Sequence, residues 1–126
     1  MNVTTSVSAL AFALFAAALA NSAAAQTSSN GLVIIKLSGD RGWKAECTFE
    51  RPDDSPITKR GRGDGGVTTF AVRGASGGEC VYTGPRRGVM QVRFVDENNE
   101  ENCPFSWITD QCIGQFEAGA EGSFKF

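Results

Sequence analysis

The sequence predicts an all-β fold, a small antiparallel β-sandwich (Ig-like or similar) of about six to eight short strands stapled by disulfides. Short apolar runs recur along the chain and are separated by Gly-rich turns. No segment after the N-terminal apolar run has convincing helical periodicity. Four cysteines supply an even number for disulfide pairing. A small β-barrel is the alternative arrangement of the same strands.

The first 25 residues have the layout of a secretory signal peptide. Their apolar run, residues 7–20, is interrupted only by Ser8, and Ala23-Ala24-Ala25 then forms a small-residue cleavage site before Gln26. The run is shorter than the roughly 18 to 20 apolar residues of a retained membrane span. No Lys or Arg precedes it, which is unusual for a signal. We expect export to the periplasm or the extracellular space.

Cleavage after Ala25 leaves a chain the size of one domain. We expect a flexible mature N-terminus at 26–30, a single β domain at 31–126 and no membrane span after cleavage. Charge is uneven along that domain. Residues 36–93 hold 11 basic and 7 acidic side chains, whereas residues 94–126 hold 1 and 7. These two poles can attract each other within the fold or face partners, and an ordinary solvated surface explains them as well.

The first strand is expected at 31–37, which is apolar on both faces and suits the centre of a sheet. In the second, residues 43–50, apolar and polar side chains alternate, which predicts one buried face. The inward members are Trp43, Ala45, Cys47 and Phe49. Residues 51–66 contain two prolines, four glycines and seven charged residues, which predicts an exposed connection.

Five further strands are expected after that connection. The inward residues are Phe70 and Val72 in the first of these strands and Met90, Val92 and Phe94 in the third. Pro104 can begin an edge strand, because no ladder donor is needed there. The expected strands are 67–73, 79–83, 89–95, 104–108 and 121–126.

Face geometry favours one of the three possible cysteine pairings. Cys47 shares the inward face of its strand, and Cys80 is expected on the face of Tyr82, so the two can form an inter-sheet bridge. Cys103 and Cys112 flank a short excursion and are expected to pair with each other. No C-x-x-C pair exists for zinc or redox chemistry, so we expect no metal site and no cofactor.

The absence of histidine excludes Ser-His-Asp and Cys-His catalysis and histidine zinc sites. Paired carboxylates remain, but no spacing singles out a pair, so we expect no catalytic residue and no enzyme. The acidic turn 96–101 offers oxygen ligands for weak calcium binding, although it lacks the EF-hand pattern and is more readily explained as a hydrated turn.

Two surface features are candidate contact sites. Arg62-Gly63-Asp64 resembles integrin-adhesion tripeptides, a poor signal that a Gly- and Arg-rich loop generates by chance. Together with Arg86 and Arg87, Arg62 forms a basic cluster that can meet an anionic surface. Trp107 lies between Cys103 and Cys112, where it either plugs a core, the commoner role, or is displayed as a contact.

These observations favour a small exported non-enzymatic binding or inhibitor module that acts on a protein or glycan through Trp107, Arg86, Arg87 and Arg62. No nucleic-acid partner is expected. Two alternatives remain: a structural or envelope-associated protein without a discrete site, and a small carboxylate hydrolase.

Overall fold

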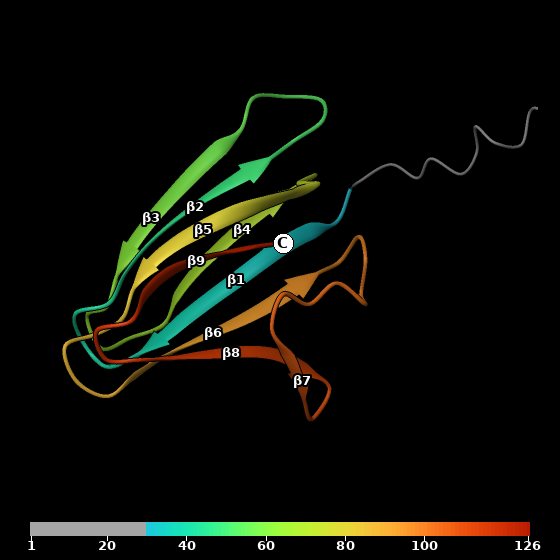
Figure 1. The fold of residues 1–126 in the computed structure, drawn as a ribbon. Helices are drawn as coiled ribbons and strands as arrows, with labels where there is room; N and C mark the ends of the chain where they lie inside the picture. Colours follow the sequence, from blue (N-terminus) through green and yellow to red (C-terminus); the bar gives the residue numbers. More distant parts are fainter. Residues whose placement is uncertain (1–29) are drawn as a thin grey trace, which may run out of the picture.

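In the computed structural model, residues 30–126 form two antiparallel β-sheets that pack face to face (Figure 1). The β-sandwich predicted from the sequence is confirmed, and the two sheets do not close into a barrel. The structure describes residues 30–126, so the predicted signal peptide at 1–25 and the start of the predicted flexible segment lie outside the described residues. Within residues 30–126, no helix has the length and apolar character needed to cross a bilayer.

One sheet has five strands and the other has four. The five-stranded sheet has the order β4 (Thr68–Arg73), β1 (Leu32–Gly39), β6 (Val89–Asp96), β8 (Gln111–Glu117) and β7 (Ser106–Ile108). The four-stranded sheet has the order β3 (Ile57–Arg62), β2 (Lys44–Glu50), β5 (Gly77–Thr83) and β9 (Glu121–Lys125). Five of the eight connections pass from one sheet to the other: β1–β2, β3–β4, β4–β5, β5–β6 and β8–β9. The chain therefore ties the two layers together repeatedly.

The core forms where the alternating apolar residues of the two sheets meet. Alternate residues are buried from Val33 to Leu37 in β1, from Ala45 to Phe49 in β2 and from Met90 to Phe94 in β6, as the period of two in a strand requires. No polar or charged residue of the described part is buried. The inward residues expected in the second strand are all buried: Trp43, Ala45, Cys47 and Phe49. β1 is the central strand that its apolar sequence predicted, between β4 and β6.

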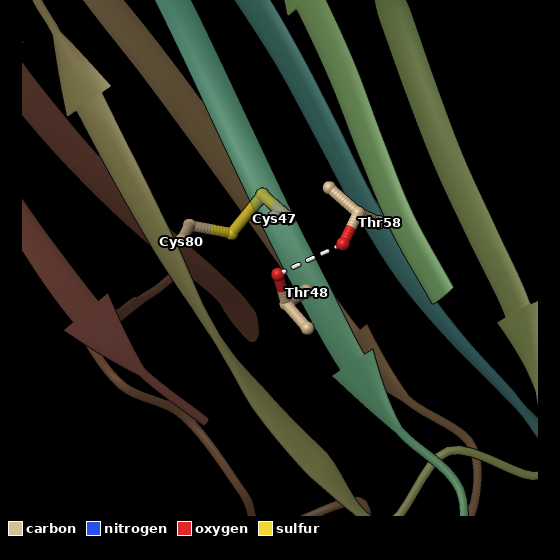
Figure 2. Close-up of a disulfide and its surroundings, with 4 residues drawn as sticks. All are labelled: Cys47, Thr48, Thr58 and Cys80. Carbon is tan, nitrogen blue, oxygen red and sulfur yellow. Dashed lines mark hydrogen bonds between the residues drawn. A yellow bond between two sulfur atoms is a disulfide. The ribbon is translucent and has the colours of Figure 1, made fainter. Parts of the chain in front are cut away.

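The described residues contain nine strands, and the sequence did not predict two of them, β3 and β8. β3 lies inside the expected exposed connection, where its single large apolar residue, Ile57, gives no alternation. Its pairing with β2 is a backbone interaction, supported by a hydrogen bond of 3.1 Å between the Thr48 and Thr58 hydroxyls (Figure 2). Arg60 also forms an ion pair with Glu46 across the same two strands. β8 was missed because Gly114 interrupts its short apolar pattern.

The first disulfide joins Cys47 of β2 to Cys80 of β5 (Figure 2). The pairing is the expected one, but its expected position as an inter-sheet bridge is wrong. Cys47 and Cys80 are register partners in neighbouring strands of the four-stranded sheet, with their Cα atoms 3.9 Å apart. Both side chains point into the core and are fully buried. Alternation correctly gave the face of each cysteine, but it carries no information about which strand lies next to which.

The second disulfide joins Cys103, in the segment before β7, to Cys112 of β8, and their Cα atoms lie 5.6 Å apart. It connects two positions in the five-stranded side of the molecule, next to its outermost strand. Both cysteine pairs are disulfides, and no free cysteine is present in the described part of the chain. Two disulfides in a small domain indicate an oxidising, exported environment.

Aromatic rings fill the space between β8 and β9, where the chain passes from one sheet to the other. The ring centroids of Tyr82 and Phe116 lie 4.1 Å apart, and those of Phe105 and Phe124 lie 4.6 Å apart. Phe126, at the end of the chain, contacts the buried ring of Phe94 at 5.4 Å. Rings in tilted and edge-to-face contact add attraction beyond their buried area. They connect β9 and the segment before β7 to the core.

The two disulfides are expected to contribute unequally to folding stability. Cys47 and Cys80 are 33 residues apart and Cys103 and Cys112 only 9. The chain-entropy model assigns about 4 kcal/mol to the longer loop and about 3 kcal/mol to the shorter one. Urea unfolding of C47A/C80A and of C103A/C112A tests this order. A smaller loss of stability in C47A/C80A than in C103A/C112A contradicts it.

Candidate functional site

The candidate site is the β7–β8 hairpin at one corner of the sandwich. Residues 106–108 of β7 pair with residues 111–113 of β8, which leaves a turn of two residues, Thr109 and Asp110. Both have positive φ, 50° and 61° respectively, which identifies a type I′ turn. A β-branched residue such as Thr109 rarely adopts this conformation. The turn therefore holds local strain at the tip of the hairpin.

Two large apolar side chains are displayed next to that tip. Trp107 is 52% exposed and Ile108 is 53% exposed. Figure 1 shows β7 turning away from the four-stranded sheet, at the lower right of the view. The alternative in which Trp107 plugs a core is therefore wrong. Exposed aromatic residues on a fixed frame are the usual anchors of protein contact surfaces.

The hairpin is held to the domain on both of its strands. Trp107 stands opposite Cys112 in the register, and Cys112 is buried and disulfide-bonded to Cys103. The ring of Phe105 lies over Gly114, so close that a Cβ added there would come within 2.6 Å of a ring carbon. Gly114 is thus required by packing, and its contact with Phe105 fixes the approach to β7. The disulfide and this contact place Trp107 in a defined position.

A cavity of about 300 Å³ lies between the hairpin and the end of β6. Trp107 and Asp110 contribute from the hairpin, and Phe94, Asp96, Glu97 and Glu100 contribute from β6 and the following turn. The predicted acidic turn and the predicted contact residue thus belong to one cavity. Asp110 and Phe94 were not identified as site residues from the sequence, because the pairing of β6 with β8 brings them there.

The carboxylates around the cavity differ in whether they already accept hydrogen bonds from the protein. Asp96 accepts hydrogen bonds from the backbone N–H of Asn98 at 2.9 Å and from the amide Nδ2 of Asn102 at 3.0 Å. Glu97 accepts the backbone N–H of Leu32 at 2.8 Å. Within residues 30–126, the exposed carboxylates of Glu100 and Asp110 have no hydrogen-bond or ion-pair partner. These two charges are available to a ligand.

The acidic turn also has an internal structural role. Asn98 accepts the backbone N–H of Gly31 at 2.7 Å and donates to the Gly31 carbonyl at 3.2 Å. Together with the Glu97 contact, this fastens the beginning of β1 to the end of β6. In the described part of the chain, no group of three or more acidic or cysteine side chains is arranged to hold a metal ion.

The predicted basic residues lie at the other end of the sandwich (Figure 1). Arg62 ends β3, and the exposed Arg86 and Arg87 lie in the β5–β6 connection. That end is closed by backbone hydrogen bonds between its turns, including Gly42 N–H to the Gly63 carbonyl at 3.2 Å and Gly119 N–H to the Pro85 carbonyl at 3.0 Å. The structure therefore separates the three arginines from Trp107, and the residues predicted to bind do not form one site.

Gly63, the glycine of the Arg-Gly-Asp tripeptide, is fixed by packing. Its N–H donates to the Trp43 carbonyl at 2.7 Å, and a Cβ added to it would overlap the buried indole of Trp43. The indole Nε1–H has no hydrogen-bond partner within the described residues. Only glycine fits at position 63, because the Trp43 indole occupies the space that a Cβ atom would need. This explains the glycine of the tripeptide without an adhesive role.

A second candidate surface is a groove of about 680 Å³ over the outer face of the four-stranded sheet. It is lined by Val81, which is 57% exposed, and by charged residues that include Lys44 and Arg62. Arg60 and Glu46 neutralise each other within it. The groove follows the strands without an exposed aromatic residue among the side chains that line it. It offers less apolar anchoring than the hairpin.

A lowered pKa is found in the β2–β3 connection, away from the cavity. The backbone N–H of Ser55, which donates at 2.7 Å, and then the Arg51 guanidinium, at 3.4 Å, lower the pKa of the Asp54 carboxyl. Arg51 also donates to the Ser55 carbonyl at 2.7 Å. Asp54 is fully exposed, so these contacts order the turn and do not create a reactive group.

No protein-family model, curated protein or solved structure matches this chain.

Replacing Gly63 with Ala tests its packing role. The methyl group would overlap the fully buried Trp43 indole, so we expect a loss of about 1 to 3 kcal/mol of folding stability in urea unfolding. Gly66→Ala is the matched control, because a Cβ there meets only one atom within 4 Å, at an ordinary 3.5 Å. Equal stability of the two variants contradicts this account.

Replacing Thr109 with Asn tests the strain in the hairpin turn. Asn tolerates positive φ and is favoured in type I′ turns, so we expect a gain of about 1 kcal/mol in thermal or urea unfolding. Thr109→Val keeps the β-branch and serves as the control, with no gain expected. A Thr109→Asn variant no more stable than Thr109→Val shows that the turn is not strained.

Proposed function

We propose that this protein is an exported, non-enzymatic binding module, and that the β7–β8 hairpin is its contact surface for a protein or glycan. One observation carries the proposal: Trp107 is half exposed on a hairpin that a disulfide fastens to the domain, next to a cavity. A half-exposed tryptophan leaves a large apolar area in water. Burying that area against a partner releases water from it, which favours association.

Pre-organisation supports the same proposal. Trp107 is a register neighbour of the disulfide-bonded Cys112, so little backbone entropy remains to be lost on binding. Ile108 extends the apolar area along the strand, and the cavity adds a concave element beside it. Contact surfaces commonly combine such a fixed aromatic anchor with a polar rim. The acidic residues of the following turn supply that rim.

The cysteines and the N-terminal sequence support an exported location for the module. Disulfides persist in the periplasm and outside the cell, and the first 25 residues have the layout of a signal peptide. The partner is therefore expected in the same compartment or on a neighbouring surface. A contact through Trp107 leaves Arg62, Arg86 and Arg87 free, because they lie at the other end of the sandwich.

The proposal predicts that Trp107→Ala loses a binding partner while staying folded. Trp107 lies outside the core, so we expect unfolding within about 1 kcal/mol of the wild type. In capture from the exported fraction of the source, followed by mass spectrometry and glycan analysis, we expect recovery of the partner to fall at least about tenfold, as for an anchor residue.

Val81→Ala is the matched control, because Val81 is also exposed but lies on the outer face of the four-stranded sheet. It is expected to recover the partner as the wild type does. Recovery of no partner by the wild type, or equal recovery by Trp107→Ala, removes the hairpin as a contact surface.

A further inference from the structure

Building on the proposed function, we infer that the cavity beside Trp107 accepts a lysine or arginine side chain of a protein partner. The volume of about 300 Å³ is at the lower end of the range of about 300 to 1,000 Å³ for ligand pockets. A cavity of this size accommodates one long side chain. The inference therefore concerns the chemistry of that one group.

The charge of the lining selects a cation. Asp96, Glu97, Glu100 and Asp110 all line the cavity. The first two already accept hydrogen bonds from the protein, whereas Glu100 and Asp110 have no partner within residues 30–126. Two unpaired carboxylates on opposite segments, the β6–β7 turn and the hairpin tip, attract a positive group placed between them.

One basic residue, Arg93, also lines this cavity. It stands opposite Lys36 in the β1–β6 register and also lines a second cavity together with Lys36. Among the described residues at the Trp107 cavity, carboxylates therefore outnumber cationic groups four to one. An anionic ligand would meet repulsion there.

The apolar part of the lining suits the stem of a basic side chain. Lys and Arg carry a chain of methylene groups, which packs on apolar surface while the charged head stays near acids and water. Trp107, which is half exposed, provides apolar surface in the lining, whereas the ring of Phe94 belongs to the core. The indole ring also attracts cations through its π face, more strongly than Tyr or Phe does. One ligand group thus satisfies both features of the cavity.

Other ligand classes fit less well. A sugar is neutral, and the Asn102 amide, which could donate to it, already donates to Asp96 at 3.0 Å. A bound metal ion is not supported, because the described residues contain no group arranged to hold one. A neutral sugar also leaves the unpaired carboxylates without a counter-charge. A basic side chain supplies that charge.

The inference is tested by nuclear magnetic resonance titration of the ¹⁵N-labelled protein. The probes are Nα-acetyl-lysine N-methylamide, its arginine analogue and the uncharged norleucine analogue. We expect the two cationic probes to shift the Trp107 indole N–H signal at millimolar concentration, and norleucine to bind at least about fivefold more weakly. The shift is expected to weaken as salt is raised, because exposed charges are screened.

The matched variants carry equal changes of charge. E100Q/D110N neutralises the two unpaired acids, and Asn suits the positive φ of 61° at position 110, so the fold is retained. We expect at least about fivefold weaker lysine binding. The control D53N/E121Q removes two exposed acids elsewhere and is expected to stay within about twofold of the wild type.

Three outcomes overturn the cation inference: equal binding of norleucine and lysine, unchanged lysine binding in E100Q/D110N, or a response of the Trp107 signal to N-acetylglucosamine in place of lysine. Partner capture separates this failure from failure of the proposed function. If Trp107→Ala loses the partner and E100Q/D110N keeps it, the hairpin is a contact surface with another ligand chemistry. If Trp107→Ala keeps the partner, the proposed function itself is wrong.

Discussion

The register between β2 and β5 is the constraint on which the four-stranded sheet depends. β2 pairs with β3 on one side and β5 on the other, and β5 in turn holds β9. Cys47 lies opposite Cys80 in this register, and their disulfide forbids a slip of one residue. Such a slip would turn Trp43 and Phe49 out of the core and place charged residues in it. The bond therefore protects the pattern that buries the core.

Sequence patterning determined the faces of the strands but not their neighbours. β2 and β6 were predicted because alternation of apolar and polar residues records which side chains meet the core. β3 lacks this alternation, since it is held at the edge of the sheet mainly by backbone pairing with β2. The same limit misplaced the Cys47–Cys80 bridge between the sheets. Side-chain period identifies a face, whereas sheet order depends on pairings distant in sequence.

The candidate site was predictable only in its separate parts. The spacing of Cys103 and Cys112 marked the excursion that carries Trp107, and the composition of residues 96–101 marked an acidic turn. That they line one cavity follows from the β6–β8 pairing, which places Phe94 opposite Cys112. For the predicted basic residues, the sequence did not indicate that they lie far from Trp107. Arg62, Arg86 and Arg87 do gather at one end, but that end is remote from Trp107.

The separation of the two ends has a consequence for any partner. The sequence divides its charge between a basic stretch and an acidic one, and the fold places exposed arginines at one end and the acidic cavity at the other. Exposed charges act over about 8 Å at physiological salt, so the carboxylates of the cavity act on a molecule that approaches the Trp107 end. If the partner is basic, as we infer, this attraction orients it toward the Trp107 end before contact. In the proposed contact, long-range attraction sets the orientation, and the disulfide-fastened indole supplies the apolar anchor.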